Sequence, residues 1–253
     1  MDSTTKTLLD EIISVARFCG DIILNADRSD IGIKDKEGRA NFVTEYDCKV
    51  QKVAQEKLQK ILPEAEFLGE EDNSEIDSSR EYVFVVDPID GTTNFIKDYH
   101  TSCISIGLVK GGKRYLGVVF NPYLDEMFYA VKGEGAYLNG KKIHVSSEEL
   151  SNGIVLFGSS PYNQELSKAS FELAYKYFQK ALDIRRSGSA AIDLCSIAAG
   201  RAELYFEMIL SPWDFAAGAL IVEEAGGIIT TLEGEEVPCF EKSSILARNK
   251  EIL

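Results

Sequence analysis

The chain has 253 residues, a length that can bury one large hydrophobic core or two small ones. Its 45% hydrophobic and 27% charged residues are ordinary for a globular protein, but 41 acidic against 27 basic residues give a net charge of −14. So acidic a chain argues against nucleic acid and anionic membranes as partners.

The N-terminal sequence and the cysteines indicate a cytoplasmic protein. Residues 1–6 are polar and the apolar residues after them have helical spacing, unlike a secretory signal. No stretch approaches the ~20 apolar residues of a membrane span. The five cysteines are scattered and form no CxxC motif, as expected for reduced thiols. The only histidines, His100 and His144, are far apart in the sequence, so a metal site should use oxygen ligands.

The first part of the chain predicts two helices followed mainly by strands. Apolar residues at helical spacing indicate helices over about 8–26 and 47–61. A short strand over 67–71 and a charged, serine-rich loop over 72–80 come next, and the apolar run 82–86 is typical of a buried strand. Four further strands, separated by glycine and proline turns, are expected at 103–109, 114–120, 126–131 and 136–138.

From about residue 146 the pattern alternates between strands and helices. Strands are expected at 154–157, 182–185 and 202–207 and near residues 228 and 245. Helices are expected over 164–180, 190–199 and 212–225. We therefore predict an α+β half over residues 1–145 packed on an α/β half over residues 146–253, forming one compact unit without a flexible linker.

The segment Asp87-Pro88-Ile89-Asp90-Gly91-Thr92-Thr93-Asn94-Phe95 is the most informative part of the sequence. It follows the run 82–86, so two carboxylates three residues apart leave the end of a buried strand. The Gly-Thr-Thr sequence predicts the start of a helix, and Pro88 stiffens the connection between the acids. Two fixed acids beside a helix N-terminus suit a hard cation on one side and a phosphate on the other.

Acids also stand at other strand ends or helix starts: Asp47, Glu70, Glu71 and Asp214. Taken singly, Asp47 and Asp214 would be helix caps or dipole partners. If the acids cluster, their mutual repulsion raises their pKa values unless cations compensate. Two divalent ions would balance four carboxylates, which is the arrangement used for in-line displacement at phosphorus. Oxygen ligands favour Mg²⁺ or Mn²⁺ over zinc.

The sequence contains no GxxxxGK[ST] loop and no set of kinase motifs, which disfavours nucleotide-driven transfer. The residues by themselves therefore indicate a Mg²⁺-dependent enzyme of phosphoryl transfer or hydrolysis.

The chain resembles the inositol monophosphatase family, within the lithium-sensitive, Mg²⁺-dependent sugar phosphatases. The matches follow the family order over almost the whole length: Lys36 with Phe42-Val43-Thr44-x-x-Asp47, Gly69-Glu70-Glu71, Asp87 to Phe95, Gly188-Ser189-Ala190, and Trp213-Asp214-x-Ala216-Ala217-Gly218. The resemblance implies the layered α-β-α-β-α sandwich of the inositol monophosphatase and fructose-1,6-bisphosphatase type, and a homodimer. Asn41 departs from the family, whose members often carry Asp there, but the central ligands are intact.

The resemblance also implies the metal ligands. A first Mg²⁺ would be held by Glu70, Asp87 and the carbonyl of Ile89. A second would be held by Asp87, Asp90 and Asp214, and a weaker third ion would lie by Glu70.

Roles in catalysis and substrate binding are implied in the same way. Asp47 and Thr92 would orient and activate the attacking water beside the first metal. Backbone amides of Gly91 and Thr92 would bind phosphate oxygens. Three residues are expected around the substrate's alcohol part, with Glu207 on the inositol hydroxyls: Ser189, Ala190 and Glu207.

The implied activity is hydrolysis of a small phosphate monoester, myo-inositol monophosphate, by in-line attack of water. Alternatives within the superfamily are fructose 1,6-bisphosphate, NADP⁺, histidinol phosphate and 3′-phosphonucleotides. The sequence Thr93-Asn94-Phe95 argues against the nucleotide and histidinol branches, and Glu207 favours inositol. A non-catalytic metal-binding scaffold would be expected to lack a metal ligand, Asp47 or Thr92, and all of these are present.

Overall fold

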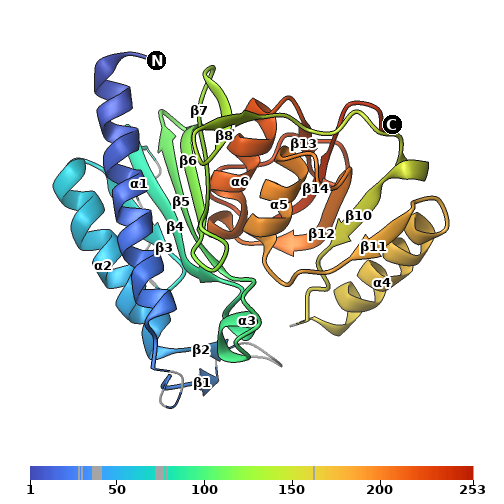
Figure 1. Ribbon diagram of the computed structural model, residues 1–253, viewed down its shortest axis with the longest axis horizontal. Helices are drawn as coiled ribbons and strands as arrows, with labels where there is room; N and C mark the ends of the chain where they lie inside the picture. Colours follow the sequence, from blue (N-terminus) through green and yellow to red (C-terminus); the bar gives the residue numbers. More distant parts are fainter. Residues whose placement is uncertain are drawn as a thin grey trace.

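Five layers alternate between helices and sheets in the computed structural model (Figure 1). Helices α1 (Ser3–Leu24) and α2 (Glu45–Ile61) cover the outer face of a seven-stranded sheet. Helices α5 (Ala190–Ala198) and α6 (Pro212–Glu224) fill the space between this sheet and a five-stranded one. Helix α4 (Gln164–Phe178) covers the far face of the second sheet. This order is the expected α-β-α-β-α sandwich.

The structure describes residues 1–27, 29, 31–35, 42–71, 77, 79–161 and 163–252. Lys36, which is part of the family resemblance, and Asn41, which departs from it, lie outside these residues, as does most of the predicted loop at 72–80. Within the described ranges, no helix combines the length and apolar character needed to cross a bilayer.

The seven-stranded sheet follows the order of the chain. Its strands are β3 (Glu66–Gly69), β4 (Tyr82–Asp90), β5 (Cys103–Lys110), β6 (Lys113–Asn121), β7 (Glu126–Val131), β8 (Gly135–Leu138) and β9 (Lys141–Ile143). Only β3 pairs in parallel, with β4, and the other neighbours are antiparallel. Helices cover both faces, so β4 and β5 are buried almost throughout, as their continuous apolar runs predict.

The five-stranded sheet has the order β11-β10-β12-β14-β13. Its strands are β10 (Ile154–Phe157), β11 (Asp183–Arg185), β12 (Leu204–Leu210), β13 (Ile228–Thr230) and β14 (Ser243–Arg248). Strand β10 lies between β11 and β12 and is parallel to both. The remaining short elements are β1 (Lys34–Asp35), β2 (Phe42–Val43), α3 (Thr92–Ile96) and the 3₁₀ turn Leu150–Asn152.

Strand β4 differs from its predicted end at residue 86, because it continues to Asp90. Asp87 pairs with Ser105 and Asp90 with Cys103, and the register shifts between the two pairs. Both acids therefore belong to an irregular strand end rather than to a free turn. Pairing with β5, which a local pattern does not contain, holds the backbone of both acids.

Two glycines on neighbouring strands let helix α6 approach the first sheet closely. Gly107 of β5 pairs with Gly117 of β6. A Cβ atom at Gly117 would lie 2.7 Å from the carbonyl oxygen of Ala217, and one at Gly107 would lie 3.0 Å from Cβ of Ala216. Because no side chain intervenes, the N-terminal end of α6, with Asp214, is brought against the sheet.

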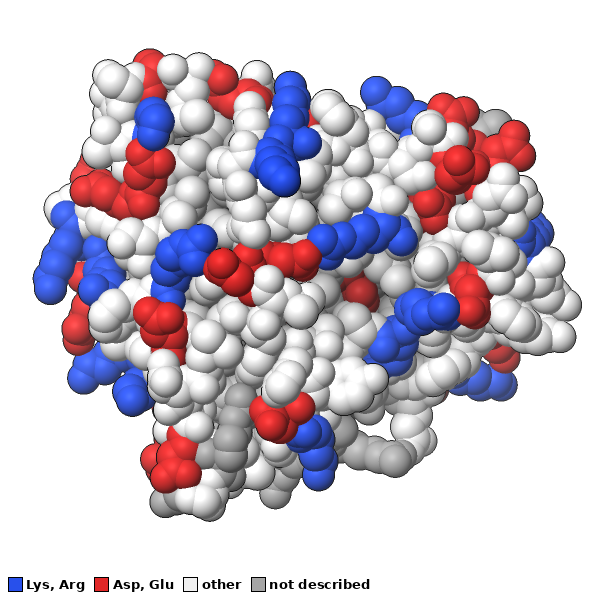
Figure 2. Space-filling view, viewed as in Figure 1, with Lys and Arg blue, Asp and Glu red and all other residues white. Residues whose placement is uncertain are grey.

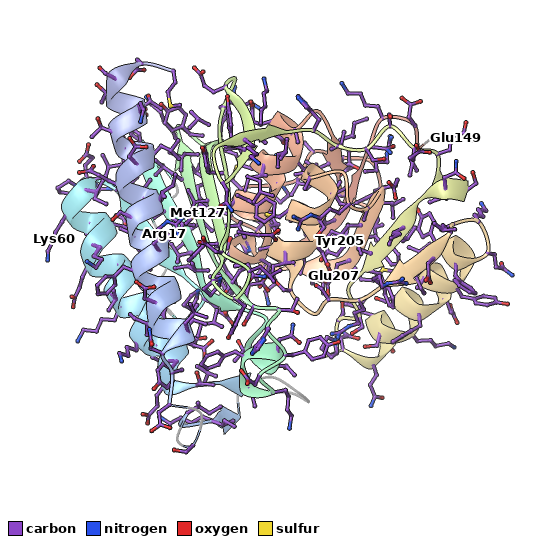
Figure 3. All side chains as sticks on the ribbon, in the orientation of Figure 1. Arg17, Lys60, Met127, Glu149, Tyr205 and Glu207 are labelled. Atoms are coloured by element: carbon purple, nitrogen blue, oxygen red, sulfur yellow. The ribbon has the colours of Figure 1, made fainter. Side chains whose placement is uncertain are left out.

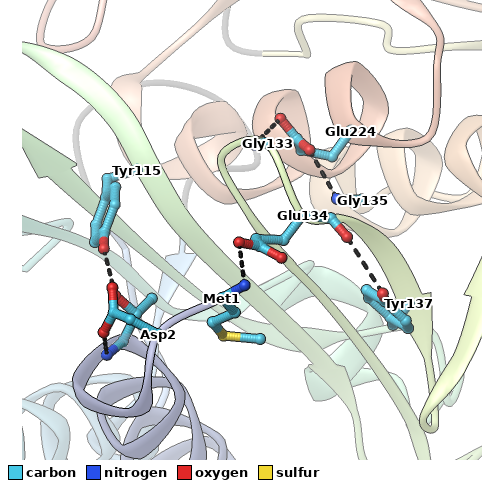
Figure 4. Close-up of polar contacts among 9 residues, drawn as sticks. Met1, Asp2, Tyr115, Gly133, Glu134, Gly135, Tyr137 and Glu224 are labelled. Atoms are coloured by element: carbon cyan, nitrogen blue, oxygen red, sulfur yellow. Dashed lines mark hydrogen bonds and ion pairs between the residues drawn. The ribbon is translucent and has the colours of Figure 1, made fainter.

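The C-terminal end of α6 is tied to the turn between β7 and β8 (Figure 4). The Glu224 carboxylate accepts hydrogen bonds from the amides of Gly133 (2.8 Å) and Gly135 (2.9 Å). The amino group of Met1 pairs with Glu134 in the same turn. These bonds fix the helix at the end opposite Asp214.

Candidate active site

A cavity of about 440 Å³ lies where the end of β4 meets the N-terminal ends of α5 and α6. Near β12, Figure 2 shows a hollow with an acidic side chain at its bottom and basic side chains on two sides. Ten of the residues predicted for the site line the cavity: Glu70, Asp87, Ile89, Asp90, Gly91, Thr92, Ser189, Ala190, Glu207 and Asp214. Segments more than a hundred residues apart therefore form one site.

Three carboxylates form the centre of this site. One oxygen from each of Asp87, Asp90 and Asp214 lies within 4.8 Å of the other two. Burial raises the pKa of Asp87 well above its usual value, and the charges of Glu70, Asp90 and Asp214 raise it further. The pKa of Asp214 is also raised well above its usual value, by burial and then by Asp90 and Glu70. The cluster is therefore electrostatically unfavourable without a compensating cation.

Local backbone structure orients two of these acids. The amide of Ile89 donates to Oδ1 of Asp87 at 3.0 Å. Asp214 is the third residue of α6, where it forms a capping box with Ser211, whose amide donates to Oδ2 at 2.7 Å. Oδ2 of Asp87 and Oδ1 of Asp214 accept no hydrogen bond from the part of the chain that the structure describes.

Asp90 is oriented by the N-terminus of α5. Its Oδ2 accepts hydrogen bonds from the Ser189 hydroxyl at 2.6 Å and from the Ala191 amide at 2.7 Å. Burial raises the pKa of Asp90, and these donors oppose that effect. Ser189 lines the cavity as predicted, but its hydroxyl is directed to a carboxylate, which sequence reasoning did not anticipate.

The acid cluster fits a divalent cation bound by oxygen. Its donors are carboxylates with raised pKa values, and two of them keep an oxygen without a hydrogen bond among the described residues. Hard oxygen donors of this kind suit Mg²⁺ or Mn²⁺. Burial is the main cause of the raised pKa values, and cation binding would offset the repulsion between the acids that adds to it.

Asp47 is the one predicted site residue that does not line the cavity, because it lies behind Thr92. Its Oδ2 accepts from the amide (2.7 Å) and hydroxyl (2.5 Å) of Thr44 in the capping box that starts α2. Its Oδ1 accepts from the Thr92 hydroxyl at 3.1 Å. The Thr92 hydroxyl also lies 3.2 Å from the carbonyl oxygen of Ile89. The structure thus joins the predicted Thr92–Asp47 pair, 45 residues apart.

Gly91 turns the chain from β4 into α3. Its φ of 89° is in the left-handed region, which favours glycine. A Cβ atom there would also lie 2.9 Å from the carbonyl oxygen of Thr101. Helix α3 has only five residues, so an anion at this end would be bound mainly by the amide donors themselves rather than by a helix dipole.

Glu207 also lines the cavity and lies next to Tyr205 on β12 (Figure 3). The Tyr205 hydroxyl donates to its Oε2 at 2.7 Å, and the Ser160 amide donates to Oε1 at 3.4 Å. Burial raises the pKa of Glu207 to about 7. A Cβ atom at position 158 would lie 1.9 Å from Cδ of Glu207, so Gly158 is needed to make room for the carboxyl group.

Sequence reasoning missed several polar or charged residues of the cavity wall, among them Asn94, Arg186, Asp193 and Lys242. Asn94 links α3 to the segment before α5, since its side-chain amide donates to the carbonyls of Thr101 (2.6 Å) and Ser187 (3.0 Å). Asp193 is buried and is the one charged residue of helix α5, and burial raises its pKa well above the usual value. A single charged residue in a mainly apolar helix was a signal that the sequence offered. Arg186 and Lys242 lie in polar stretches of the chain, and no local sequence pattern there indicated a site.

The five-layer fold and its buried carboxylate cluster define a member of the metal-dependent phosphatase superfamily. The chain belongs to the inositol monophosphatase family, whose model matches residues 5–253. This finding confirms the family that the sequence motifs indicated.

Two relatives are identical to this chain at about a third of the aligned positions. A Nus factor SuhB of Xylella fastidiosa is 34% identical over 235 residues, covering 92% of this chain and 85% of the relative. Inositol monophosphatase 2 of Solanum lycopersicum is 37% identical over 238 residues, covering 91% and 89%. The family therefore includes proteins named for an enzyme and proteins named as a Nus factor.

Solved structures confirm the fold class. An IMPase of Thermotoga maritima matches with a TM-score of 0.87 and 31% identity, covering 96% of this chain and 92% of that one. IMPase-II of Staphylococcus aureus, solved with bound inositol monophosphate, matches with a TM-score of 0.79 and 28% identity, covering 94% and 87%.

Proposed function

We propose that this chain is a Mg²⁺-dependent phosphatase that hydrolyses myo-inositol monophosphate. The observation that carries the proposal is the meeting of Asp87, Asp90 and Asp214 within 4.8 Å in a cavity that also presents Thr92 and Glu207. The three aspartates can bind cations, the Thr92 hydroxyl can bind a water molecule, and Glu207 can accept hydrogen bonds from the hydroxyls of an alcohol.

Five residues would hold the metal ions in this proposal: Glu70, Asp87, Ile89 through its carbonyl, Asp90 and Asp214. When bound, Mg²⁺ supplies positive charge that stabilises the charge on the phosphoryl oxygens in the transition state. Two or three ions per site are proposed, with Mn²⁺ able to replace Mg²⁺.

Thr92 and Asp47 would activate the nucleophile. The attacking water gives a proton to the Thr92 hydroxyl, which passes its own proton to Oδ1 of Asp47 at 3.1 Å. Burial raises the pKa of Asp47, so this carboxylate is a better base than an exposed aspartate. The second oxygen of Asp47 is occupied by Thr44, which keeps Oδ1 directed at Thr92.

The phosphate and the alcohol would bind on opposite sides of the acids. Amides of Gly91 and Thr92 would donate to phosphate oxygens at the start of α3. Glu207 would accept hydrogen bonds from the ring hydroxyls, beside Ser189 and Ala190. The inositol monophosphate bound to the related S. aureus enzyme supports this choice of substrate.

The relatives named Nus factor SuhB suggest a second candidate, a protein whose role does not need catalysis. A scaffold of this kind would be free to lose Thr92 or Asp47, and here both are present and in contact. We therefore propose catalysis, with a small phosphate monoester and not a nucleic acid as the partner. A homodimer in the cytoplasm is part of the same proposal.

A panel of phosphate esters tests the proposal. Phosphate release would be measured from inositol 1-phosphate, fructose 1,6-bisphosphate, NADP⁺, histidinol phosphate and a 3′-phosphonucleotide, each with Mg²⁺ and after EDTA treatment. We expect inositol 1-phosphate to give the highest kcat/KM, EDTA to abolish release, and Li⁺ to inhibit. A higher kcat/KM for fructose 1,6-bisphosphate would identify that ester as the substrate instead. No phosphate release from any ester would favour the non-catalytic candidate.

A further inference from the structure

Two basic residues lie at the mouth of the cavity. Arg186, which follows β11, and Lys242, which precedes β14, are the basic residues among the described ones that line it. Both are exposed, whereas Asp87 and Asp90 are only 2% and 7% exposed. The cations therefore stand near the solvent and the acids at the bottom, which is the arrangement around the hollow in Figure 2.

Arg186 has no carboxylate partner, unlike most arginines of this chain. Its Nε donates to the Ser159 hydroxyl at 2.9 Å, and no acceptor within the described ranges binds its terminal nitrogens. Arg248 donates to backbone carbonyls. The other described arginines form ion pairs with carboxylates: Arg17, Arg80, Arg114, Arg185 and Arg201. In a chain with 41 acidic and 27 basic residues, an arginine without such a partner is an exception.

The position of Arg186 is fixed by its neighbours. Ser159, which accepts from its Nε, is 7% exposed. The carbonyl of Ser159 accepts from the Ser167 hydroxyl at 2.7 Å, which fastens this segment to α4. The terminal N–H groups of Arg186 thus remain as donors on a fixed planar fork, which matches the oxygens of a phosphate. Lys242 can add a point charge to the same anion.

A purely structural role for Arg186 would be to balance the nearby acids of the wall, Asp193 and Glu207. No ion pair joins Arg186 to either acid in the part of the chain that the structure describes. Burial raises the pKa of Glu207 to about 7 and that of Asp193 well above its usual value. Neither acid is therefore held fully charged by the guanidinium at neutral pH, and the charge of Arg186 is left for a ligand.

The acids of the cavity explain why cations are needed at its mouth. Six acids line the cavity: Glu70, Asp87, Asp90, Asp193, Glu207 and Asp214. A phosphate monoester carries a charge of about −1.5 to −2 at pH 7, so these acids repel it until it reaches bound metal ions. Basic side chains at the mouth of a cleft raise the local concentration of an anion and speed its association about 10–10³-fold.

We infer that Arg186 and Lys242 form an entry site for anions, which binds the phosphate group of the ester at the mouth of the cavity before it reaches the acids. The inference rests on the proposed function only for the identity of the ester, because binding at this site needs neither metal nor turnover.

Phosphate binding without metal tests the site directly. The EDTA-treated full chain would be titrated calorimetrically with inorganic phosphate and with inositol 1-phosphate. Without metal ions the acids repel both ligands, so binding reports the entry site. Arg186→Ala and Lys242→Ala should each raise the dissociation constant by at least about tenfold. Arg186→Lys should lie between Arg186→Ala and the wild type, since it keeps the charge but loses the fork.

Arg185→Ala is the matched control for this titration, because Arg185 is the neighbour of Arg186, pairs with Asp183 and does not line the cavity. It should leave the dissociation constants unchanged. A wild type that binds neither ligand overturns the inference, and so does binding that Arg186→Ala leaves intact. Unchanged melting temperatures show that the variants are folded.

The salt dependence of the reaction tests the role in entry. At saturating Mg²⁺, the double variant of Arg186→Ala with Lys242→Ala should lower kcat/KM for inositol 1-phosphate about tenfold, mainly through KM. Added salt should lower kcat/KM less in this variant than in the wild type, because fewer attractions remain to be screened. An equal salt dependence of the two proteins overturns the entry role. If no ester is hydrolysed, the catalytic proposal fails, and the phosphate titration still decides whether the entry site exists.

Discussion

The Thr92 hydroxyl is the group whose catalytic and structural roles can be separated most clearly. The N-cap of α3 is Gly91, so removing the Thr92 hydroxyl removes no helix cap. Among the described residues, the hydroxyl makes two long hydrogen bonds, of 3.1 Å to Asp47 and 3.2 Å to the carbonyl of Ile89. Asp47 keeps both donors from Thr44. Thr92→Ala should therefore cost about 1 kcal/mol of folding free energy.

The catalytic effect of Thr92→Ala should be much larger than its effect on stability. General-base assistance is worth about 10²–10⁴-fold, which corresponds to roughly 3–5 kcal/mol of activation free energy. We expect kcat to fall by this factor, with KM and the Mg²⁺ dependence little changed, since no metal ligand is lost. The measurements are phosphate release at saturating Mg²⁺ and calorimetric melting. Thr93→Ala is the matched control, because Thr93 also lines the cavity but its side chain is exposed and makes no hydrogen bond among the described residues.

A double-variant cycle decides whether Thr92 and Asp47 act as one unit. Asp47→Asn should lower kcat as strongly as Thr92→Ala, but it should also destabilise the protein, because Asp47 completes the capping box of α2. The double variant should be scarcely slower than either single variant, since a proton relay is broken only once. Losses in kcat that multiply would refute the relay. A kcat for Thr92→Ala within a few-fold of the wild type would remove Thr92 from catalysis.

Three further variants test the rest of the site. Asp214→Asn should lower kcat at least about 100-fold. It should also raise the melting temperature of the metal-free protein, because it removes a buried charge from the repelling cluster. Near-normal turnover at saturating Mg²⁺ would count against a metal-binding role of Asp214. Ser189→Ala removes the 2.6 Å hydrogen bond to Asp90. A titration of the rate with Mg²⁺ should show that the apparent affinity for Mg²⁺ falls about 10–100-fold. An unchanged Mg²⁺ requirement would show that this bond does not orient Asp90 as a metal ligand. Glu207 keeps its proton in the folded state up to a pKa of about 7, against 4.5 for an ordinary glutamate, so its contribution to stability falls as the pH rises from about 4.5 to 7 and is constant above. Glu207→Gln should remove this decline of about 3 kcal/mol in the free energy of unfolding. Urea unfolding should therefore show that the stability of the variant rises relative to that of the wild type between about pH 4.5 and 7. Parallel pH profiles of the two proteins would contradict the burial of this carboxyl group.

Features that depend on neighbouring residues in the chain could be predicted from the sequence. The apolar run before Asp87 predicted a buried strand, and the Gly91-Thr92 sequence predicted the turn into a helix, which is α3. Pro212 at a helix start predicted α6 and placed Asp214 in its first turn. Strand propensity, turn residues and helix caps act over a few residues, so each of these signals was complete within its own segment. The order of the motifs along the chain then identified the family, which the comparisons confirm.

Other features became visible only when distant segments were brought together. The extension of β4 to Asp90 depends on pairing with β5, and the orientation of Asp90 depends on donors from α5, a hundred residues further on. Asp193 and Arg186 enter the cavity wall because α5 and the loop after β11 meet at this place. The sequence predicted helix α4 but not which of its sides would remain uncovered. A local pattern encodes the conformation of a segment, whereas contacts, burial and pKa shifts arise from the neighbours that the packing of layers supplies.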